Sequence, residues 1–181
     1  MKKPLEELTL EELWQLFPII LSEYQPVWVE RYHTESIKIQ KAFPVGTIIR
    51  MNHIGSTAVP GLLAKPTIDI LMEVAENTDS EEIIQIMQKL EYIYSPQPEN
   101  PEPHMMFMKG YTPEGFKGQA YHVHIRYPDD WNEIYFRDYL KKHPLVAREY
   151  EKLKLKLQTQ SGCLHSSQNR LYRTYYTTST K

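Results

Sequence analysis

The chain has 181 residues, which is enough for one domain that buries roughly two-thirds of the surface of its unfolded chain. Its formal charge is −2 and its pI is near 6.4, whereas a nucleic-acid-binding domain is expected to be basic, so we expect no nucleic-acid partner. The single cysteine, Cys163, excludes an intramolecular disulfide, and the absence of a long apolar run or a signal-like segment predicts a cytoplasmic protein without a membrane span.

Residues 9–42 predict two helices. Thr9 and Glu12 have the spacing of a capping box, and Pro18 ends the short helix that follows. A second helix is predicted from about Pro26 to Ala42, because apolar residues recur among charged ones at helical spacing. Proline suits the first turn of such a helix.

Residues 46–127 predict the strands of a sheet. Two runs rich in β-branched residues, Thr47–His53 and Thr67–Val74, are separated by glycine and proline. The second run carries Asp69, Leu71 and Glu73 on one side. Because Glu73 lies about 13 Å along the strand from Asp69, only one of these acids can belong to a compact metal site. Thr78 to Glu81 is a further capping-box spacing and predicts a helix after this strand.

A hairpin is predicted from His104–Lys109 and Gln119–Tyr127, joined by residues 110–118. Its second strand places His122, His124 and Arg126 on one side. Two histidines at this spacing can both reach one metal ion or one phosphate, and the alternative is a pair of neutral, hydrogen-bonded structural histidines. Because adjacent strands lie ~5 Å apart, we consider the pair together with Asp69.

Residues 130–160 predict two more helices. The first begins with the capping-box spacing of Asp130 and Glu133, and the second begins at Pro144. Three lysines on the second helix predict a solvated basic face: Lys152, Lys154 and Lys156. Beyond Gly162 the periodicity is poor and predicts at most a short helix near residues 169–176, with Cys163 as a free packing or surface thiol. We therefore predict a single α+β domain over residues 1–181, with N-terminal helices in 9–42, a sheet core in 46–127 and C-terminal helices in 130–160.

The connection between the first two strands carries the strongest functional pattern. Gly55 and Ser56 at a strand's end can offer backbone N–H groups and a hydroxyl to an anion, with Thr57 beside them. Lys65 adds a positive charge. Asp69 is a carboxylate inside an apolar strand, where a charge is costly unless it has a partner. This pattern predicts a phosphate site bordered by an acid.

The stretch HIGSTAVPGLLAKPTIDIL, residues 53–71, resembles the signature of the GrpB family. The sequence His122-Val123-His124 resembles the family's HxH strand, and residues 136–150 resemble its FRDYLRxHPxxAxEY segment. The resemblance implies a nucleotidyltransferase fold of the DNA polymerase beta type, a mixed β-sheet flanked by helices. In that superfamily a Gly-Ser pair contacts nucleotide phosphates and paired acids bind divalent metal.

Carried over position by position, the resemblance assigns phosphate contact to Gly55 and Ser56 and the first paired acid to Asp69. The second acid falls at Leu71, and residues 176–181 match the family's Tyr-x-x-Ala-Lys element only loosely. Two-metal phosphoryl transfer needs carboxylates that hold ions about 3.5–4 Å apart. We therefore expect at most one divalent ion, held by Asp69 with His122 and His124 and better suited to Zn or Mn than to Mg.

The expected function is the binding of a nucleotide or another phosphate-bearing small molecule, with weak nucleotidyl transfer as an added activity. Asp69 is expected to act as metal ligand or general base, while His53, His122 and His124 line the pocket and Arg137 of the family motif adds a cation. Two alternatives stay open: a binding module without chemistry, and a hydrolase that uses water on an Asp/His-bound ion.

Overall fold

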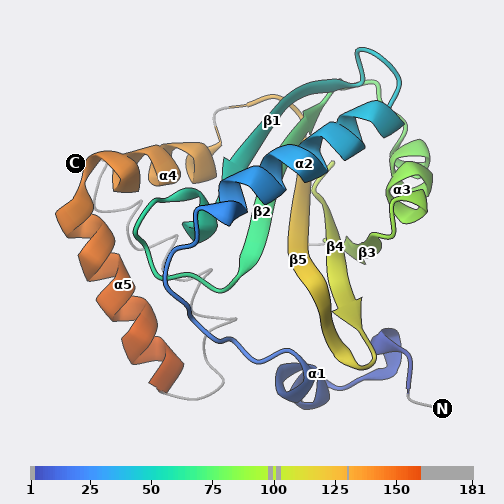
Figure 1. The fold of residues 1–181 in the computed structure, drawn as a ribbon. Coiled ribbons are helices and arrows are strands. Elements are labelled where there is room, and N and C mark those ends of the chain that lie inside the picture. The colour runs from blue at the N-terminus through green and yellow to red at the C-terminus, as the bar shows by residue number, and fades with distance from the viewer. Residues whose placement is uncertain (1–2, 98–99, 101–102, 130, 160–181) are drawn as a thin grey trace.

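The computed structural model describes residues 3–97, 100, 103–129 and 131–159, and these form a mixed sheet flanked by helices (Figure 1). The sheet has five strands in the order β1-β2-β5-β4-β3. Their bounds are β1 (Ile48–Ile54), β2 (Thr67–Val74), β3 (Ile93–Pro96), β4 (Met105–Thr112) and β5 (Gly115–Arg126). Strand β2 runs antiparallel to β1 and parallel to β5, and β4 runs antiparallel to both β5 and β3. The predicted α+β fold with a mixed sheet is confirmed.

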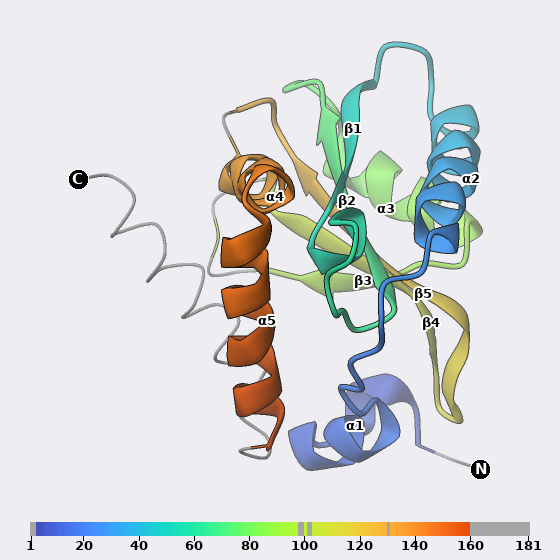
Figure 2. The same ribbon diagram turned by 60° about the vertical axis from the view of Figure 1, so that its left-hand side comes forward.

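Helices cover both faces of this sheet, as Figure 2 shows, with α2 and α3 on one side and α4 and α5 on the other. Their bounds are α1 (Leu10–Leu16), α2 (Val27–Ala42), α3 (Ser80–Lys89), α4 (Asn132–Lys142) and α5 (Pro144–Thr159), with short 3₁₀ helices η1 (Leu5–Glu7) and η2 (Ser56–Ala58). Among the described residues, every helix is too short or too polar to pass through a bilayer.

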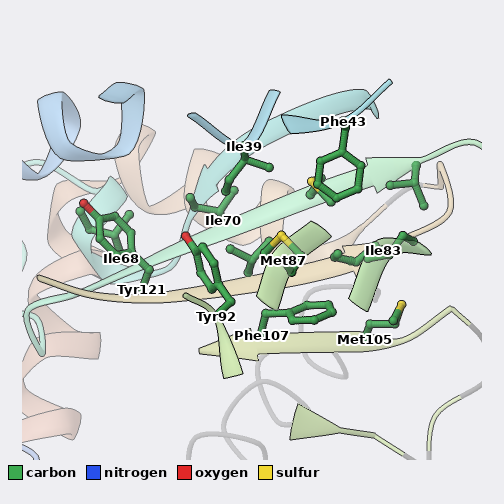
Figure 3. Packing of buried hydrophobic residues seen from close by; sticks show 14 of the residues in the cluster. Ile39, Phe43, Ile68, Ile70, Ile83, Met87, Tyr92, Met105, Phe107 and Tyr121 are labelled. Carbon is green, nitrogen blue, oxygen red and sulfur yellow. The ribbon is translucent and has the colours of Figure 1, made fainter. Parts of the chain in front are cut away.

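The main core lies between the sheet and helices α2 and α3 (Figure 3). Alternate residues of β2, among them Ile68 and Ile70, point toward it and are fully buried. Ile39 of α2 and Met87 of α3 pack against them. Burying a side chain of this size contributes about 1.5–3 kcal/mol, so the period of two in β2 fixes which of its faces meets the helices.

The other face of β2 carries its two acids, and only Asp69 keeps contact with solvent. Glu73 is completely buried and binds the Arg50 guanidinium, whose Nη2 lies 2.7 Å from Glu73 Oε1. The backbone N–H of Asp129 donates to the same oxygen at 3.4 Å. Glu73 is thus a structural acid that joins β1 and β2 to the segment before α4.

Most element boundaries follow the sequence prediction, and the helix caps show where it was wrong. The Thr9 capping box is present, but α3 is capped by Asp79, which accepts a hydrogen bond from the Glu81 N–H, and not by Thr78. Helix α4 begins at Asn132, and its N-cap residue Trp131 makes no side-chain capping bond, while the predicted cap at position 130 is not tested by the described residues. Asp130, Cys163, the short helix near 169–176 and the element at 176–181 lie outside the described residues.

Two strand predictions also change. The hairpin strands extend to Thr112 and from Gly115, which leaves a two-residue turn where residues 110–118 were expected to form the connection. Gly110, which was expected to begin the connection after the first hairpin strand, lies instead at a bulge within β4. Strand β3 was not predicted, because prolines follow it closely and mask a short edge strand.

Substituting Arg50 tests the structural role of Glu73. In Arg50→Met the Glu73 carboxylate stays buried without its cation, and we expect the free energy of unfolding to fall by about 3 kcal/mol. Urea denaturation of this variant, with the exposed-site variant Lys89→Met as control, measures the loss. Equal stability of both variants would show that Glu73 does not depend on Arg50.

Candidate functional site

The site is a cluster of Asp69 on β2 with His122 and His124 on β5. Asp69 pairs directly with His122 in the parallel register, so their side chains emerge on the same face. His122 Nδ1 lies 3.2 Å and His124 Nε2 3.7 Å from Asp69 Oδ1. The side chains are 27%, 19% and 25% exposed, so the cluster is partly open to solvent. The structure brings together the acid and the two imidazoles that the sequence singled out.

The imidazoles keep Asp69 ionised. Burial alone raises the pKa of a carboxyl, but hydrogen bonds and charge from His122 and His124 outweigh it and hold the pKa of Asp69 well below its ordinary value. Asp69 is therefore a carboxylate at neutral pH, able to bind a cation.

Gly55 gives the Asp69 carboxylate its space. Its backbone has φ 71° and ψ −173°, a region that is essentially reserved for glycine. A Cβ at this position would lie 2.5 Å from Asp69 Oδ2. The first glycine of the signature stretch is thus explained by the acid packed against it, a role that the sequence analysis did not foresee.

Tyr111 holds His122 in place and was missed by the sequence analysis. Its hydroxyl lies 2.7 Å from His122 Nε2, and the two rings stack with centroids 5.6 Å apart. Burial raises the pKa of Tyr111, so the phenol stays protonated and can donate to Nε2 while Nδ1–H donates to Asp69. Residue 111 was assigned to a connection, but it belongs to β4, where it pairs with Phe116 while its side chain reaches His122.

Lys65 lies next to this group with an unusual charge environment. Its Nζ is 3.4 Å from the Tyr111 hydroxyl and faces the rings of Tyr111 and Phe116. Among the described residues no carboxylate comes within 4.0 Å of it. Burial lowers the pKa of Lys65, and the charge of Asp69 partly offsets this effect. A half-buried cation without an ionic partner is a natural point of contact for an anion.

His53 was predicted to line the pocket and Thr57 to bind ligand beside Gly55 and Ser56, but the structure does not bring their side chains to the cluster. His53 pairs with Ile70 and therefore points toward α2, where its ring stacks on Tyr32 at 4.8 Å. Its Nε2 lies 3.1 Å from the Thr57 hydroxyl, which donates to the Thr67 carbonyl at 3.0 Å. Burial lowers the pKa of His53 to about 4, with Asp69 opposing the effect, so this ring is neutral and joins the loop to the sheet.

Arg137 holds together two elements that lie around the site. Its guanidinium, on α4, donates to the His53 carbonyl at 2.9 Å and to Asp138 Oδ1 at 2.7 Å. A weaker contact of 3.5 Å reaches Asn52 Oδ1. These bonds fix the end of β1 to α4, and the hydrogen bonds of Arg137 with the described residues go to these two elements and not to the Asp69 cluster.

Ser56 is held by a lysine of α5, which corrects a second expectation. Lys154 is 2% exposed, so it does not belong to a solvated basic face. Its Nζ donates to Ser56 Oγ at 3.1 Å and to the Leu63 carbonyl, and it lies over the ring of Tyr150. Lys154 lies one helical turn after the buried Tyr150, and this spacing was the sequence signal for its burial.

The contact with Lys154 also orients the Ser56 hydroxyl. An ammonium group has no acceptor, so Ser56 Oγ must accept this bond and keeps its own hydrogen for another acceptor. Burial lowers the pKa of Lys154 to about 8, and Glu151 opposes the effect. At neutral pH Ser56 is therefore set up as a donor.

Comparison with known proteins finds several relatives of this chain. A family profile described as GrpB protein matches residues 18–179. The chain is 36% identical over 131 residues to a UPF0157 protein of Pseudomonas aeruginosa, covering 71% of this chain and 52% of that one. It is 33% identical over 141 residues to the UPF0157 protein YqkA of Bacillus subtilis, covering 76% and 39%. The chain thus spans about half or less of the length of these two relatives.

A third relative and a solved structure match over most of their length. The glutamate-rich protein GrpB of Alkalihalophilus pseudofirmus is 34% identical over 143 residues, covering 77% of this chain and 80% of that one. The crystal structure of the conserved protein GrpB from Enterococcus faecalis superposes with a TM-score of 0.68 at 29% identity, covering 86% of this chain and 93% of that one.

Alanine at position 55 tests the space requirement of Asp69. In Gly55→Ala the new Cβ strains the backbone and displaces the carboxylate, and we expect a loss of about 2–3 kcal/mol in unfolding free energy. Gly61→Ala is the matched control, because Gly61 also has a positive φ but its new Cβ would meet no atom of the described residues within 4 Å. Chemical denaturation should rank Gly55→Ala well below Gly61→Ala, and the opposite order contradicts the packing argument.

Removing the ammonium of Lys154 tests its buried role. Lys154→Met leaves the Leu63 carbonyl without this donor, and we expect a loss of about 1–3 kcal/mol in unfolding free energy. Lys152→Met, on the exposed side of the same helix, should have little effect. Thermal and urea unfolding of the two variants measure the difference in stability. Equal effects would show that Lys154 contributes no more to stability than a lysine on the solvated face.

Proposed function

The chain belongs to the GrpB family, and we propose that it binds a nucleotide or another phosphate-bearing small molecule beside one divalent metal ion. One observation carries this proposal. Asp69, His122 and His124 each offer a ligand atom, and these atoms all lie within 4.8 Å of one another. One carboxylate and two imidazoles on adjacent strands form a donor set that fits a single ion.

The donor set also favours particular metals. Two imidazole nitrogens suit Zn or Mn better than Mg, which prefers oxygen ligands and water. The position of the superfamily's second acid holds Leu71, which is 1% exposed and has no ligand atom. Asp69, His122 and His124 would therefore hold one ion, and a bound ion would supply positive charge to neutralise phosphate oxygens.

The chain's own groups would complete an anion site. Lys65 supplies a cation without a carboxylate partner among the described residues, next to Tyr111 and hence to His122. Ser56 offers a hydrogen to an acceptor, because its oxygen already accepts from Lys154. Both groups can bind phosphate oxygens without breaking an ion pair first.

The missing second acid decides between binding and transfer. Two-metal nucleotidyl transfer needs carboxylates that bridge two ions, and one Asp with two His does not provide them. We therefore propose binding as the main activity, with weak nucleotidyl transfer at most. A three-ligand metal site leaves room for a further ligand, and this feature supports metal-dependent hydrolysis as the second candidate.

Titration of metal into the wild type and Asp69→Asn tests the proposal. By isothermal titration calorimetry we expect the wild type to bind one Zn or Mn ion and Asp69→Asn to bind it at least tenfold more weakly, because the charged ligand is lost. Asp79→Asn is the matched control, since asparagine also caps α3. Equal affinity of wild type and Asp69→Asn would falsify the ligand assignment.

Incubation with labelled nucleoside triphosphates and Mg, Mn or Zn separates the activities. Retention of intact nucleotide with measurable affinity supports the binding module. Nucleotidyl label on an acceptor, with pyrophosphate released, supports transfer. Free nucleoside mono- or diphosphate, released with pyrophosphate or phosphate and without labelled acceptor, supports hydrolysis. Absence of nucleotide binding with every metal contradicts a nucleoside triphosphate as the ligand and leaves another phosphate-bearing small molecule, with the metal titration as the test of the rest of the proposal.

A further inference from the structure

A cavity of about 320 Å³ opens beside Lys65, between the segment before α2, the start of β2 and the β4–β5 hairpin. Its walls are mainly apolar, and Lys65, Thr67 and Phe116 contribute to the lining. This volume lies at the small end of the range of small-molecule sites, roughly 300–1,000 Å³. It suits one ring system better than a whole nucleotide.

Two polar groups at this cavity have no matching partner inside the described part of the protein. Thr67 is 5% exposed, and its hydroxyl oxygen has no hydrogen-bond partner there. Lys65 has no carboxylate partner there. Because buried polar groups are nearly always hydrogen-bonded, these two point to a ligand that supplies an anion and a polar ring edge.

Phe116 gives the cavity an aromatic wall that is held in place. Its ring packs edge-on against Phe17 at 5.1 Å and Tyr111 at 5.2 Å, yet it remains 42% exposed. An aromatic ring fixed in this way can stack on a flat ring without losing much side-chain freedom. Such a wall favours a planar ligand group over a flexible aliphatic one.

The cavity is connected to the Asp69–His122–His124 cluster through the side chains of Lys65 and Tyr111. Lys65 lines the cavity and its Nζ lies 3.4 Å from the Tyr111 hydroxyl. That hydroxyl in turn lies 2.7 Å from His122 Nε2. A ligand with a ring at one end and a phosphate at the other can therefore occupy the cavity while its anion faces Lys65 and the cluster.

We propose that this cavity is the subsite for the nucleobase, with the ring against Phe116, a polar atom of the ring bonded to the Thr67 hydroxyl and the phosphate toward Lys65. The inference rests on the proposed function, and it narrows the ligand from any phosphate-bearing molecule to a nucleotide. A second hollow of about 430 Å³ beside α1 carries no such argument, because its cation, Lys3, is already paired with Glu12.

Calorimetry with three probes tests the subsite: adenosine 5′-monophosphate, uridine 5′-monophosphate and ribose 5-phosphate, each in the presence of Mn. The nucleotides are expected to bind at least tenfold more tightly than ribose 5-phosphate, because only they carry a base that can stack. Equal affinity of all three probes overturns the subsite.

Two variants locate the base. Phe116→Ala should weaken nucleotide binding about tenfold and leave ribose 5-phosphate unchanged. Thr67→Val should weaken nucleotide binding at unchanged melting temperature, because the hydroxyl has no partner inside the described protein to lose. Ile37→Ala, an exposed apolar residue on α2, is the matched control and should change neither.

The outcomes distinguish this inference from the proposed function. If ribose 5-phosphate and the nucleotides bind equally, with a loss in Asp69→Asn and none in Phe116→Ala or Thr67→Val, the phosphate site stands and the base subsite is wrong. If none of the probes binds, both proposals are wrong. Nucleotide-selective loss in Phe116→Ala and Thr67→Val supports both.

Discussion

The contact of the Asp69 carboxylate with Gly55, His122 and His124 is the constraint on which the site depends. A charge within an otherwise apolar strand is tolerated only if it is compensated. The two imidazoles do this from the neighbouring parallel strand, and they keep the pKa of Asp69 low although burial acts in the opposite direction. The carboxylate fits because position 55 has no Cβ, so one glycine and one strand pairing together create the cluster.

The signature stretch between β1 and β2 works through several separate contacts. Gly55 makes room for Asp69, Thr57 ties the stretch to β2 through the Thr67 carbonyl, and Ser56 receives a hydrogen bond from Lys154 of α5. Glu151 of the same helix accepts from the Leu63 N–H at 3.1 Å. The stretch is therefore held by the sheet and by α5 at once, and a loop fixed in this way can keep its groups in position before a ligand arrives.

Ion pairing distinguishes the charged residues that stabilise the fold from Lys65 at the candidate site. Glu73 binds Arg50, the buried Glu35 accepts from Lys109 at 2.9 Å, and Arg137 binds Asp138. Each of these charged groups forms an ion pair within the protein, and these pairs stabilise the fold. Lys65 differs, since among the described residues it faces aromatic rings and a phenol but no carboxylate. This difference is why we propose the cavity beside Lys65, and not the larger hollow beside α1, as a ligand site.

Local patterns in the sequence determined most helices and strands and placed the two histidines of the cluster on one side of a strand. Long-range strand pairing decided which residues meet them. The helix over residues 27–42 and the strand over residues 67–74 follow from their periodicity, and the period of two put His122 and His124 on one side. Which strand lies beside β2 depends on contacts between distant residues. That pairing brought Asp69 to His122 and turned His53 away toward α2, whereas the β4–β5 hairpin brought Tyr111 to His122. The spacing of Lys154 from Tyr150 puts both residues on one face of α5, but only the tertiary structure decided that this face meets the loop and not water.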